Sequence, residues 1–445
     1  MTKIVKIKKG LDIPLYGAAA ADRVVNDTAT DLFAISPDDF PGYKWKAAVK
    51  EGDTVKAGSP LLQAKEEESL CLTSPVSGTV VEIHRGERRK IEYVSVREDK
   101  QDLSEKFDTA ADKESIMKTL RASGLLAMMR QRPFDIVPLS GFEPRDIFVT
   151  AFDSAPLAVP MVDEWVRKYL EKGLEVLTKL TAGKVYLSIP AGMELTSQAA
   201  EVVEFEGPHP AGNVGTQIAA IAPVNKGETV WTLSAVTAAR IGQLYAEGSV
   251  NYDTRVALTG ADMKDPHIVE TKIGASLSTL LKDQLNTTGE DVRVISGNVL
   301  TGVKENPQTG FLRFPYRQIT AIDEGNHADE FMGWASMDPR KYSVKKTFPA
   351  FLRGLAKPFN FDARVKGGHR AMIMSGEYDK VFPMDIYPEF LIKAIIAKDI
   401  ERMEQLGIYE VAPEDFALPE FVDTSKLELQ KIVRDGLDYL RKETM

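Results

Sequence analysis

The chain has 445 residues, of which 43% are hydrophobic and 27% are charged, an ordinary globular mixture with material for roughly three domains. The net charge of −9 argues against a general nucleic-acid-binding protein, and no apolar run approaches the roughly 20 residues of a spanning helix. The single cysteine, Cys71, excludes an internal disulfide and a four-thiolate iron–sulfur cluster, and five scattered histidines argue against a structural zinc site.

The first 97 residues predict a short strand, an arm and a compact β module. Residues 4–7 have strand character, and the rest of residues 1–42 is expected to be an irregular arm. This basic start lacks the apolar stretch of a signal peptide, so the chain is expected to stay in the cytoplasm. Residues 43–97 place turn residues between β-branched runs, which is the pattern of hairpins.

Residues 98–253 alternate strand patterns with helical patterns. Asp112 is expected to cap a first helix, and residues 160–177 carry apolar positions at helical spacing. Residues 147–151 and 184–189 have the apolar character of buried strands. This alternation predicts βαβ units and a Rossmann-like α/β domain.

The remainder of the chain predicts a small mixed unit followed by helices. Residues 254–330 are expected to form a β-grasp-like domain with a short helix at 274–282 and a late strand at 311–314. Residues 331–445 are expected to be a linker and a helical domain. One amphipathic helix is predicted through residues 390–406, and Ser425 to Glu428 have the pattern of a capping box for a second.

The β module at residues 43–97 resembles the barrel-sandwich hybrid of biotinyl and lipoyl domains. The segments EGDTVKAGSPLL and SPVSGTVVEI are similar to the two arms of that fold. A carrier protein would use a lysine at the hairpin between the arms, and the nearest lysine is Lys65. Lys65 lacks the flanking methionines of a biotin site and is followed by three glutamates, so a solvated loop is the alternative reading.

Nine segments in matching order resemble one family, the A subunits of bacterial sodium-translocating NADH:quinone oxidoreductases. The segments are KKGLDIPLYG, EGDTVKAGSPL, PVSGTVVEIHRGERR, GLLAMMRQRPFD, IFVTAFDSAPLA, FEGPHPAGNVGTQIAAIAPV, IGASLSTLL, VRVISGNVLTG and GGHRAMIMSGEYDKVFPMDI. The resemblance implies a multidomain α/β chain with a barrel-sandwich hybrid, a Rossmann-like domain, a β-grasp (SLBB-like) domain and C-terminal helices.

This family is distantly related to the NADH-binding flavoprotein subunit of complex I and to the C subunit of the Rnf complex. Their glycine-rich flavin-phosphate loop corresponds here to residues 124–134, which carry bulky side chains. Their ECEP-like segment corresponds to residues 151–156, which lack one acid and the cysteine. The resemblance therefore implies the scaffold of a flavoprotein without its flavin and cluster sites.

The resemblance also implies a place in a complex. NADH, flavins and iron–sulfur centres would belong to partner subunits, quinone would be the electron acceptor, and electron transfer would be coupled to Na+ export. This chain would bind no cofactor or metal and supply no catalytic residue. It would lie peripherally on the cytoplasmic side of the inner membrane, docked chiefly on the membrane-embedded B subunit. A flavin- and NADH-binding oxidoreductase subunit is one alternative, and a biotinyl or lipoyl carrier is another.

Two sequence segments suggest where a quinone could contact the chain. Arg130, Arg132, Pro133 and Phe134 combine guanidinium donors with an apolar ring, and a quinone head group needs both. An exposed loop with arginines at a subunit interface is the alternative. His209 lies in GPHPAGNVGT, which has no phosphate-loop spacing and reads either as a proline turn between two elements or as a quinone-facing surface.

Overall fold

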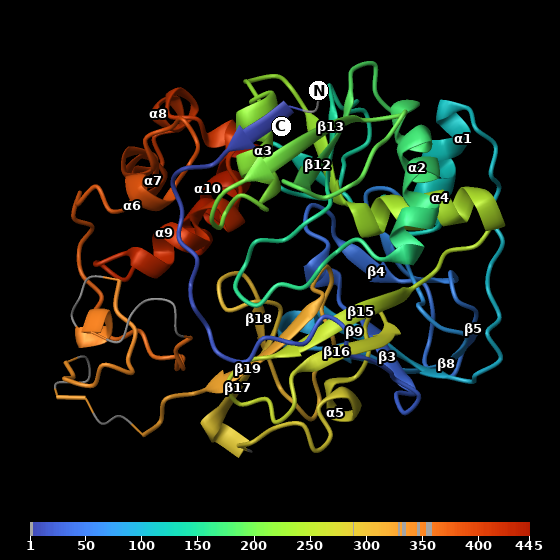
Figure 1. Cartoon of the computed structure of the whole chain (residues 1–445). Coiled ribbons are helices and arrows are strands. Elements are labelled where there is room, and N and C mark those ends of the chain that lie inside the picture. Colours follow the sequence, from blue (N-terminus) through green and yellow to red (C-terminus); the bar gives the residue numbers. More distant parts are fainter. Residues whose placement is uncertain (1–2, 288, 328–329, 332–334, 345–347, 353–357) are drawn as a thin grey trace.

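The structure is a computed structural model that describes the whole chain except residues 1–2, 288, 328–329, 332–334, 345–347 and 353–357. Four sheets and a C-terminal group of helices make up the described part. Figure 1 shows the C-terminal helices on one side of the central α/β domain, and α2 and α4 on the other. The predicted combination of a barrel-sandwich unit, an α/β domain, a mixed β unit and C-terminal helices is confirmed.

The α/β domain contains a six-stranded sheet in the order β1-β13-β12-β11-β14-β10. All neighbours pair in parallel except β10, which is antiparallel to β14. Its strands are β1 (Lys3–Lys6), β10 (Arg130–Arg132), β11 (Ile147–Thr150), β12 (Val185–Pro190), β13 (Glu201–Glu206) and β14 (Val230–Ser234). Its helices are α1 (Lys113–Ala122), α2 (Glu164–Thr178), α3 (Val214–Ile221) and α4 (Ala235–Glu247).

The two faces of this sheet are covered by different helices, because successive side chains on a strand point to opposite faces. Ile147 and Val149 on β11 pack in the core that α2 and α4 share. Phe148, between them, packs in a separate core with Ile218 of α3. The sheet is therefore buried on both sides, as the apolar strand sequences predict.

The chain reverses its direction across the sheet between β11 and β14. From β11 it passes to β12 and β13, and then returns to form β14 on the other side of β11. The carboxyl ends of β11 and β14 are therefore neighbours, and the helices that follow them, α2 and α4, pack against each other on the same face of the sheet. The first turns of α2 and α4 lie at this point.

The mixed β unit is a six-stranded sheet in the order β18-β17-β19-β15-β16-β2. Its strands are β2 (Val24–Asn26), β15 (Asp253–Thr259), β16 (His267–Lys272), β17 (Val292–Ser296), β18 (Val303–Glu305) and β19 (Gln318–Asp323). The strand predicted at 311–314 is wrong, since Phe311 makes only an isolated bridge to Ser276. The helix predicted at 274–282 shortens to α5 (Leu277–Leu280).

The barrel-sandwich unit consists of two small sheets, β3-β9-β8-β5 and β4-β6-β7. Its strands are β3 (Leu32–Ile35), β4 (Trp45–Ala47), β5 (Thr54–Val55), β6 (Pro60–Ala64), β7 (Cys71–Thr73), β8 (Gly78–Arg85) and β9 (Ile91–Glu98). Lys65 is exposed just after β6, in the turn that leads to β7.

The short strand predicted at residues 4–7 forms as β1, which joins the α/β sheet. The rest of the N-terminal arm is not irregular, contrary to the prediction: it supplies β2 to the mixed sheet and β3 to the barrel-sandwich unit. Figure 1 shows its trace running from β1 down to the mixed sheet. A short strand of three or four residues leaves little local pattern, because its partners lie far away in the sequence.

The C-terminal helices pack around their own core. They are α6 (Tyr378–Val381), α7 (Pro388–Ala397), α8 (Ile400–Gln405), α9 (Ala417–Val422) and α10 (Leu429–Thr444). The single helix predicted through 390–406 is interrupted, because Lys398 adopts a φ of 55° and Asp399 caps a new helix. The predicted capping box does not form: Glu428 caps α10 without a side-chain bond, and the Ser425 hydroxyl donates to the Ala371 carbonyl.

Candidate functional site

The arginines predicted to face a quinone lie on β10, a buried strand and not an exposed loop. Arg130 donates from Nη1 to the carbonyls of Ala127 and Met129 and from Nη2 to the carbonyl of Asp39 at 2.6 Å. Burial lowers the pKa of Arg130. Its guanidinium is thus occupied by main-chain oxygens of this chain.

Arg132 connects the α/β domain to the C-terminal helices. Its Nη1 lies 2.9 Å from Asp415 and its Nη2 lies 2.6 Å from Glu414. The Arg132 and Asp415 side chains are 1% and 2% exposed, so this is a dry ion pair. Burial alone would lower the pKa of Arg132, but the two carboxylates outweigh it and raise that pKa.

Pro133 and Phe134 are buried next to this ion pair. Phe134 has a φ of 83° and packs in the C-terminal core. Its carbonyl accepts from Arg434 of α10 at 2.6 Å. The segment predicted to meet a quinone therefore contacts the C-terminal helices from Arg132 to Phe134, whereas Arg130 bonds to main-chain oxygens elsewhere.

His209 lies in the turn between β13 and α3. Its ring is 3% exposed, and its Nδ1 lies 3.1 Å from the Ser154 hydroxyl, which accepts from the Gly212 N–H at 2.8 Å. Its Nε2 is buried without a hydrogen-bond partner among the described residues. Burial lowers the pKa of His209 to about 4, so the ring is neutral at pH 7.

None of these five predicted residues lines the two large cavities found in the described part of the chain. One cavity, of about 820 Å³, lies among the C-terminal segments. The other, of about 370 Å³, lies where the α/β domain, the mixed sheet and the barrel-sandwich unit meet. We call this second one the three-domain cavity.

The three-domain cavity lies beside the N-terminal ends of α2 and α4, the helices that follow β11 and β14. The first turns of α2 and α4 contribute Asp163, Trp165, Val166 and Val236. The mixed sheet and its flanking residues contribute Asn251, Asp253, Thr254, Arg255, Glu270, Thr271, Lys272 and Arg317. The arm and the barrel-sandwich unit contribute Asn26, Asp27, Thr30, Phe33 and Glu98.

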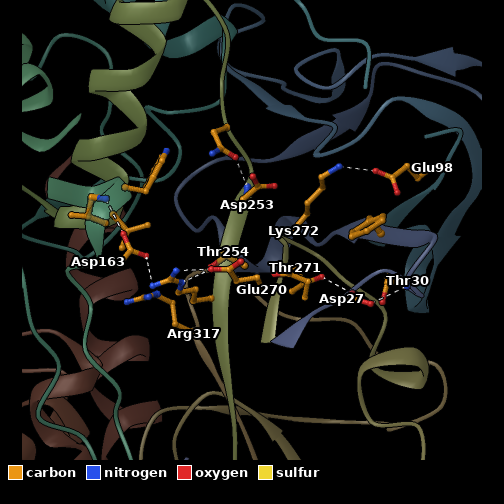
Figure 2. Close-up of a pocket in the computed structure, with 17 residues that line it drawn as sticks. Asp27, Thr30, Glu98, Asp163, Asp253, Thr254, Glu270, Thr271, Lys272 and Arg317 are labelled. Carbon is orange, nitrogen blue, oxygen red and sulfur yellow. Dashed lines mark hydrogen bonds and ion pairs between the residues drawn. The ribbon is translucent and has the colours of Figure 1, made fainter. Parts of the chain in front are cut away.

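Most charged groups in this cavity are paired with one another (Figure 2). Arg255 lies 3.3 Å from Asp163 and 2.6 Å from Glu270, and Lys272 lies 2.7 Å from Glu98. Figure 2 shows Arg317 and Asp163 at one end of the cavity and the Lys272–Glu98 pair at the other.

Arg317 is not paired in this way. Its side chain makes no hydrogen bond or ion pair within the part of the chain that the structure describes, and its Nε is buried. Burial lowers its pKa, although the charges of Asp163 and Asp153 oppose that shift. A guanidinium without a hydrogen-bond partner on a cavity wall lowers the stability of the fold unless a molecule outside the chain accepts its hydrogen bonds.

The cavity residues were missed in the sequence because they come from widely separated segments. Asp163 is visible as the N-cap of α2, where it accepts from the Val166 N–H. Nothing in the local pattern of Arg317 or Asp253 distinguishes them from other charged residues beside strands. Only the topology brings them together.

Among the described residues, no group of three or more histidine, cysteine, aspartate or glutamate side chains is arranged to hold a metal ion. No helix in the same part of the chain is both long and apolar enough to cross a membrane.

Comparison with known proteins gives a consistent result across the chain. Residues 5–99 match the NqrA N-terminal barrel-sandwich hybrid domain, residues 111–250 the NqrA second alpha/beta domain, and residues 255–306 the NQRA C-terminal domain. The chain is 38% identical over 451 residues to the A subunit of the Na(+)-translocating NADH-quinone reductase of Actinobacillus succinogenes. It is 37% identical to that of Hahella chejuensis, and each match covers 99% of this chain and 100% of the relative.

Among solved structures, an NAD+-reducing [NiFe]-hydrogenase chain aligns with a TM-score of 0.36 and 13% identity, over 76% of this chain and 63% of the other. That likeness is too weak to support a functional argument. The full-length sequence matches are sufficient by themselves. The chain belongs to the family of Na(+)-translocating NADH-quinone reductase A subunits.

Proposed function

We propose that this chain works as the peripheral A subunit of an NADH–quinone reductase complex that exports Na+, and that it supports quinone reduction by its partners. One observation carries the proposal: the identity of 38% extends over 99% of this chain and 100% of a relative that bears this name. The alignment therefore leaves no part of that relative without a counterpart in this chain.

In this proposal the chain docks on the membrane-embedded B subunit on the cytoplasmic side of the inner membrane. NADH, flavins and iron–sulfur centres belong to partner subunits, and quinone is the electron acceptor. The chain itself contributes no redox group. Its contribution is to shape and stabilise the place where quinone is reduced.

We also propose how the predicted quinone-facing residues act. The Nη donors of Arg130 and Arg132 are already bonded within the chain, and Phe134 packs in the core of the C-terminal helices. These residues and His209 would therefore act as positioning residues. Arg132 and Phe134 hold the C-terminal helices against the α/β domain, whereas Arg130 and His209 fix β10 and the turn before α3. A quinone would meet the surface that these residues support.

The first experiment compares the complex purified with and without this chain. We expect the depleted complex to oxidise NADH with an artificial acceptor and to lose reduction of a short-chain quinone, which returns when the chain is added back. Full quinone reduction by the depleted complex would contradict the proposed function.

The second experiment replaces Arg132 in the intact complex. Arg132→Met leaves Asp415 as an uncompensated buried charge, which costs about 3–5 kcal/mol, so the C-terminal helices should loosen. We expect the KM for quinone to rise while NADH oxidation by the artificial acceptor is unchanged. Arg293→Met is the matched control, because Arg293 pairs with Glu324 inside the mixed sheet. If Arg132→Met prevents assembly, Arg132→Lys, which retains the charge, should show a smaller rise in KM.

A further inference from the structure

The three-domain cavity has the location and size of a ligand site. It lies beside the N-terminal ends of α2 and α4, which follow the neighbouring strands β11 and β14. Its volume of about 370 Å³ lies within the range of small-molecule pockets. Three units of the chain contribute to its wall, as is common for sites at domain junctions.

The charges in its wall indicate a single anionic group on the ligand. Arg317 is unpartnered, and Arg240 behind it is bonded only to the main-chain carbonyls of Asn251 and Asp253. Neither guanidinium has a hydrogen-bonded carboxylate: the charges of Asp163 and Asp153 act on Arg317, but they leave its donors unbonded. A carboxylate or phosphate oxygen placed against Arg317 would satisfy it.

The same wall excludes a highly charged ligand. The lining holds five carboxylates, Asp27, Glu98, Asp163, Asp253 and Glu270, against three cations. A ligand with several negative charges would be repelled by this excess. Carboxylates accept hydrogen bonds, so they favour hydroxyl or amine donors on the part of the ligand that is remote from Arg317.

An apolar surface completes the site. Phe33, Trp165, Val166 and Val236 lie in the wall, and the Trp165 indole is fixed by its Nε1 donating to Gln243 at 2.8 Å. An indole held in one orientation offers a surface against which a flat ring of a ligand can pack.

We propose that the three-domain cavity binds a small molecule with one carboxylate or phosphate group at Arg317, a flat ring in the apolar part, and hydroxyl or amine donors directed to the carboxylates. This site is separate from the positioning residues around Arg132. It requires no partner subunit, so its test is independent of the assembly experiments.

The probe that fits this description is 3,4-dihydroxybenzoate, with benzoate and catechol as truncated comparisons. Benzoate lacks the hydroxyl donors and catechol lacks the carboxylate. We expect isothermal titration calorimetry of the full chain to give a dissociation constant below about 1 mM for 3,4-dihydroxybenzoate. Each comparison compound should bind at least about tenfold more weakly. Absence of measurable binding by all three to the folded chain would overturn the proposal.

Arg317→Met is the decisive variant and should weaken 3,4-dihydroxybenzoate at least about tenfold. Arg167→Met is its control, because Arg167 lies on α2, is exposed and does not line the cavity. Unchanged affinity in Arg317→Met would overturn the proposal. If Arg317→Met does not fold, Asp253→Asn provides the test. This variant should bind 3,4-dihydroxybenzoate more weakly than the native chain does and bind benzoate equally well. If it bound 3,4-dihydroxybenzoate as tightly as the native chain, the proposed site would be contradicted.

Discussion

The buried ring of His209 makes the stability of the chain depend on pH. When the chain unfolds, the imidazole takes up a proton below its ordinary pKa of about 6.5. In the folded chain burial lowers that pKa to about 4. Between these two values the unfolded state binds more protons, so the free energy of unfolding decreases as the pH falls from about 6.5 to about 4.

His209→Gln should remove this contribution. We expect the difference in free energy of unfolding between the native chain and the variant to change by about 2–3 kcal/mol from pH 7 to pH 4.5. Denaturant titrations at several pH values measure it. His369→Gln serves as the control, since His369 is exposed. An unaltered pH slope in His209→Gln would show that the ring is solvated in the folded chain.

At the scale of secondary-structure elements, the close packing of α2 against α4 depends on two glycines. A Cβ atom at Gly173 would collide with the Ala238 carbonyl, and one at Gly242 with the Tyr169 carbonyl. These collisions involve main chain and not flexible side chains, so the helices would have to separate. The close approach also fixes the first turns of both helices at the three-domain cavity.

Gly173→Ala tests this contact. Alanine gains about 1 kcal/mol in helix propensity over glycine, but the forced separation costs more. We expect a net loss of about 1–2 kcal/mol in the free energy of unfolding, measured by chemical denaturation. Gly368→Ala should have almost no effect, because no atom lies within 4 Å of a Cβ there. A stabilised Gly173→Ala would mean that the helices are further apart in solution.

The elements that were predicted correctly carry their signal locally. Asp112 accepts from the Ser115 N–H at the start of α1, and β11 and β12 form where apolar runs predicted them. The elements that were missed are defined by distant partners. Arg130–Arg132 becomes a strand only because it pairs with Thr232, Trp231 and Val230. Residues 303–305 and 318–323 likewise become strands through the sheet to which they are added.

The predicted site residues show the same limit. Residue type alone indicated that Arg132 could donate to a ligand, but its carboxylate partners at 414 and 415 lie nearly three hundred positions later. The unpartnered arginine, Arg317, had no sequence signal. The sequence shows which groups are available, whereas the tertiary structure determines which of them are already satisfied.

At the scale of the whole molecule, the N-terminal arm joins three sheets. Deletion of residues 1–26 removes β1 and β2, leaves the edges of β13 and β16 open, and removes the buried side chains of Ile13 and Leu15. Open sheet edges promote association between chains. We expect the midpoint of thermal unfolding to fall by at least about 5 °C, with aggregation visible by size-exclusion chromatography.

Deletion of residues 442–445 is the control, because these residues are exposed at the end of α10. It should leave the midpoint and the elution volume unchanged. If removal of the arm were equally harmless, the three sheets would be held together by their other contacts, and the arm strands would be peripheral additions.

The pairing of the arm also sets the order in which parts of the chain can fold during synthesis. The arm leaves the ribosome before its partners, because β1 pairs with β13 at residues 201–206 and β2 pairs with β16 at residues 267–272. At about 5–20 residues per second, these partners are synthesised about 10–50 s after the arm. The arm is therefore fixed only after both partners have been made, and closure of these long loops limits the rate of folding more than helix formation does.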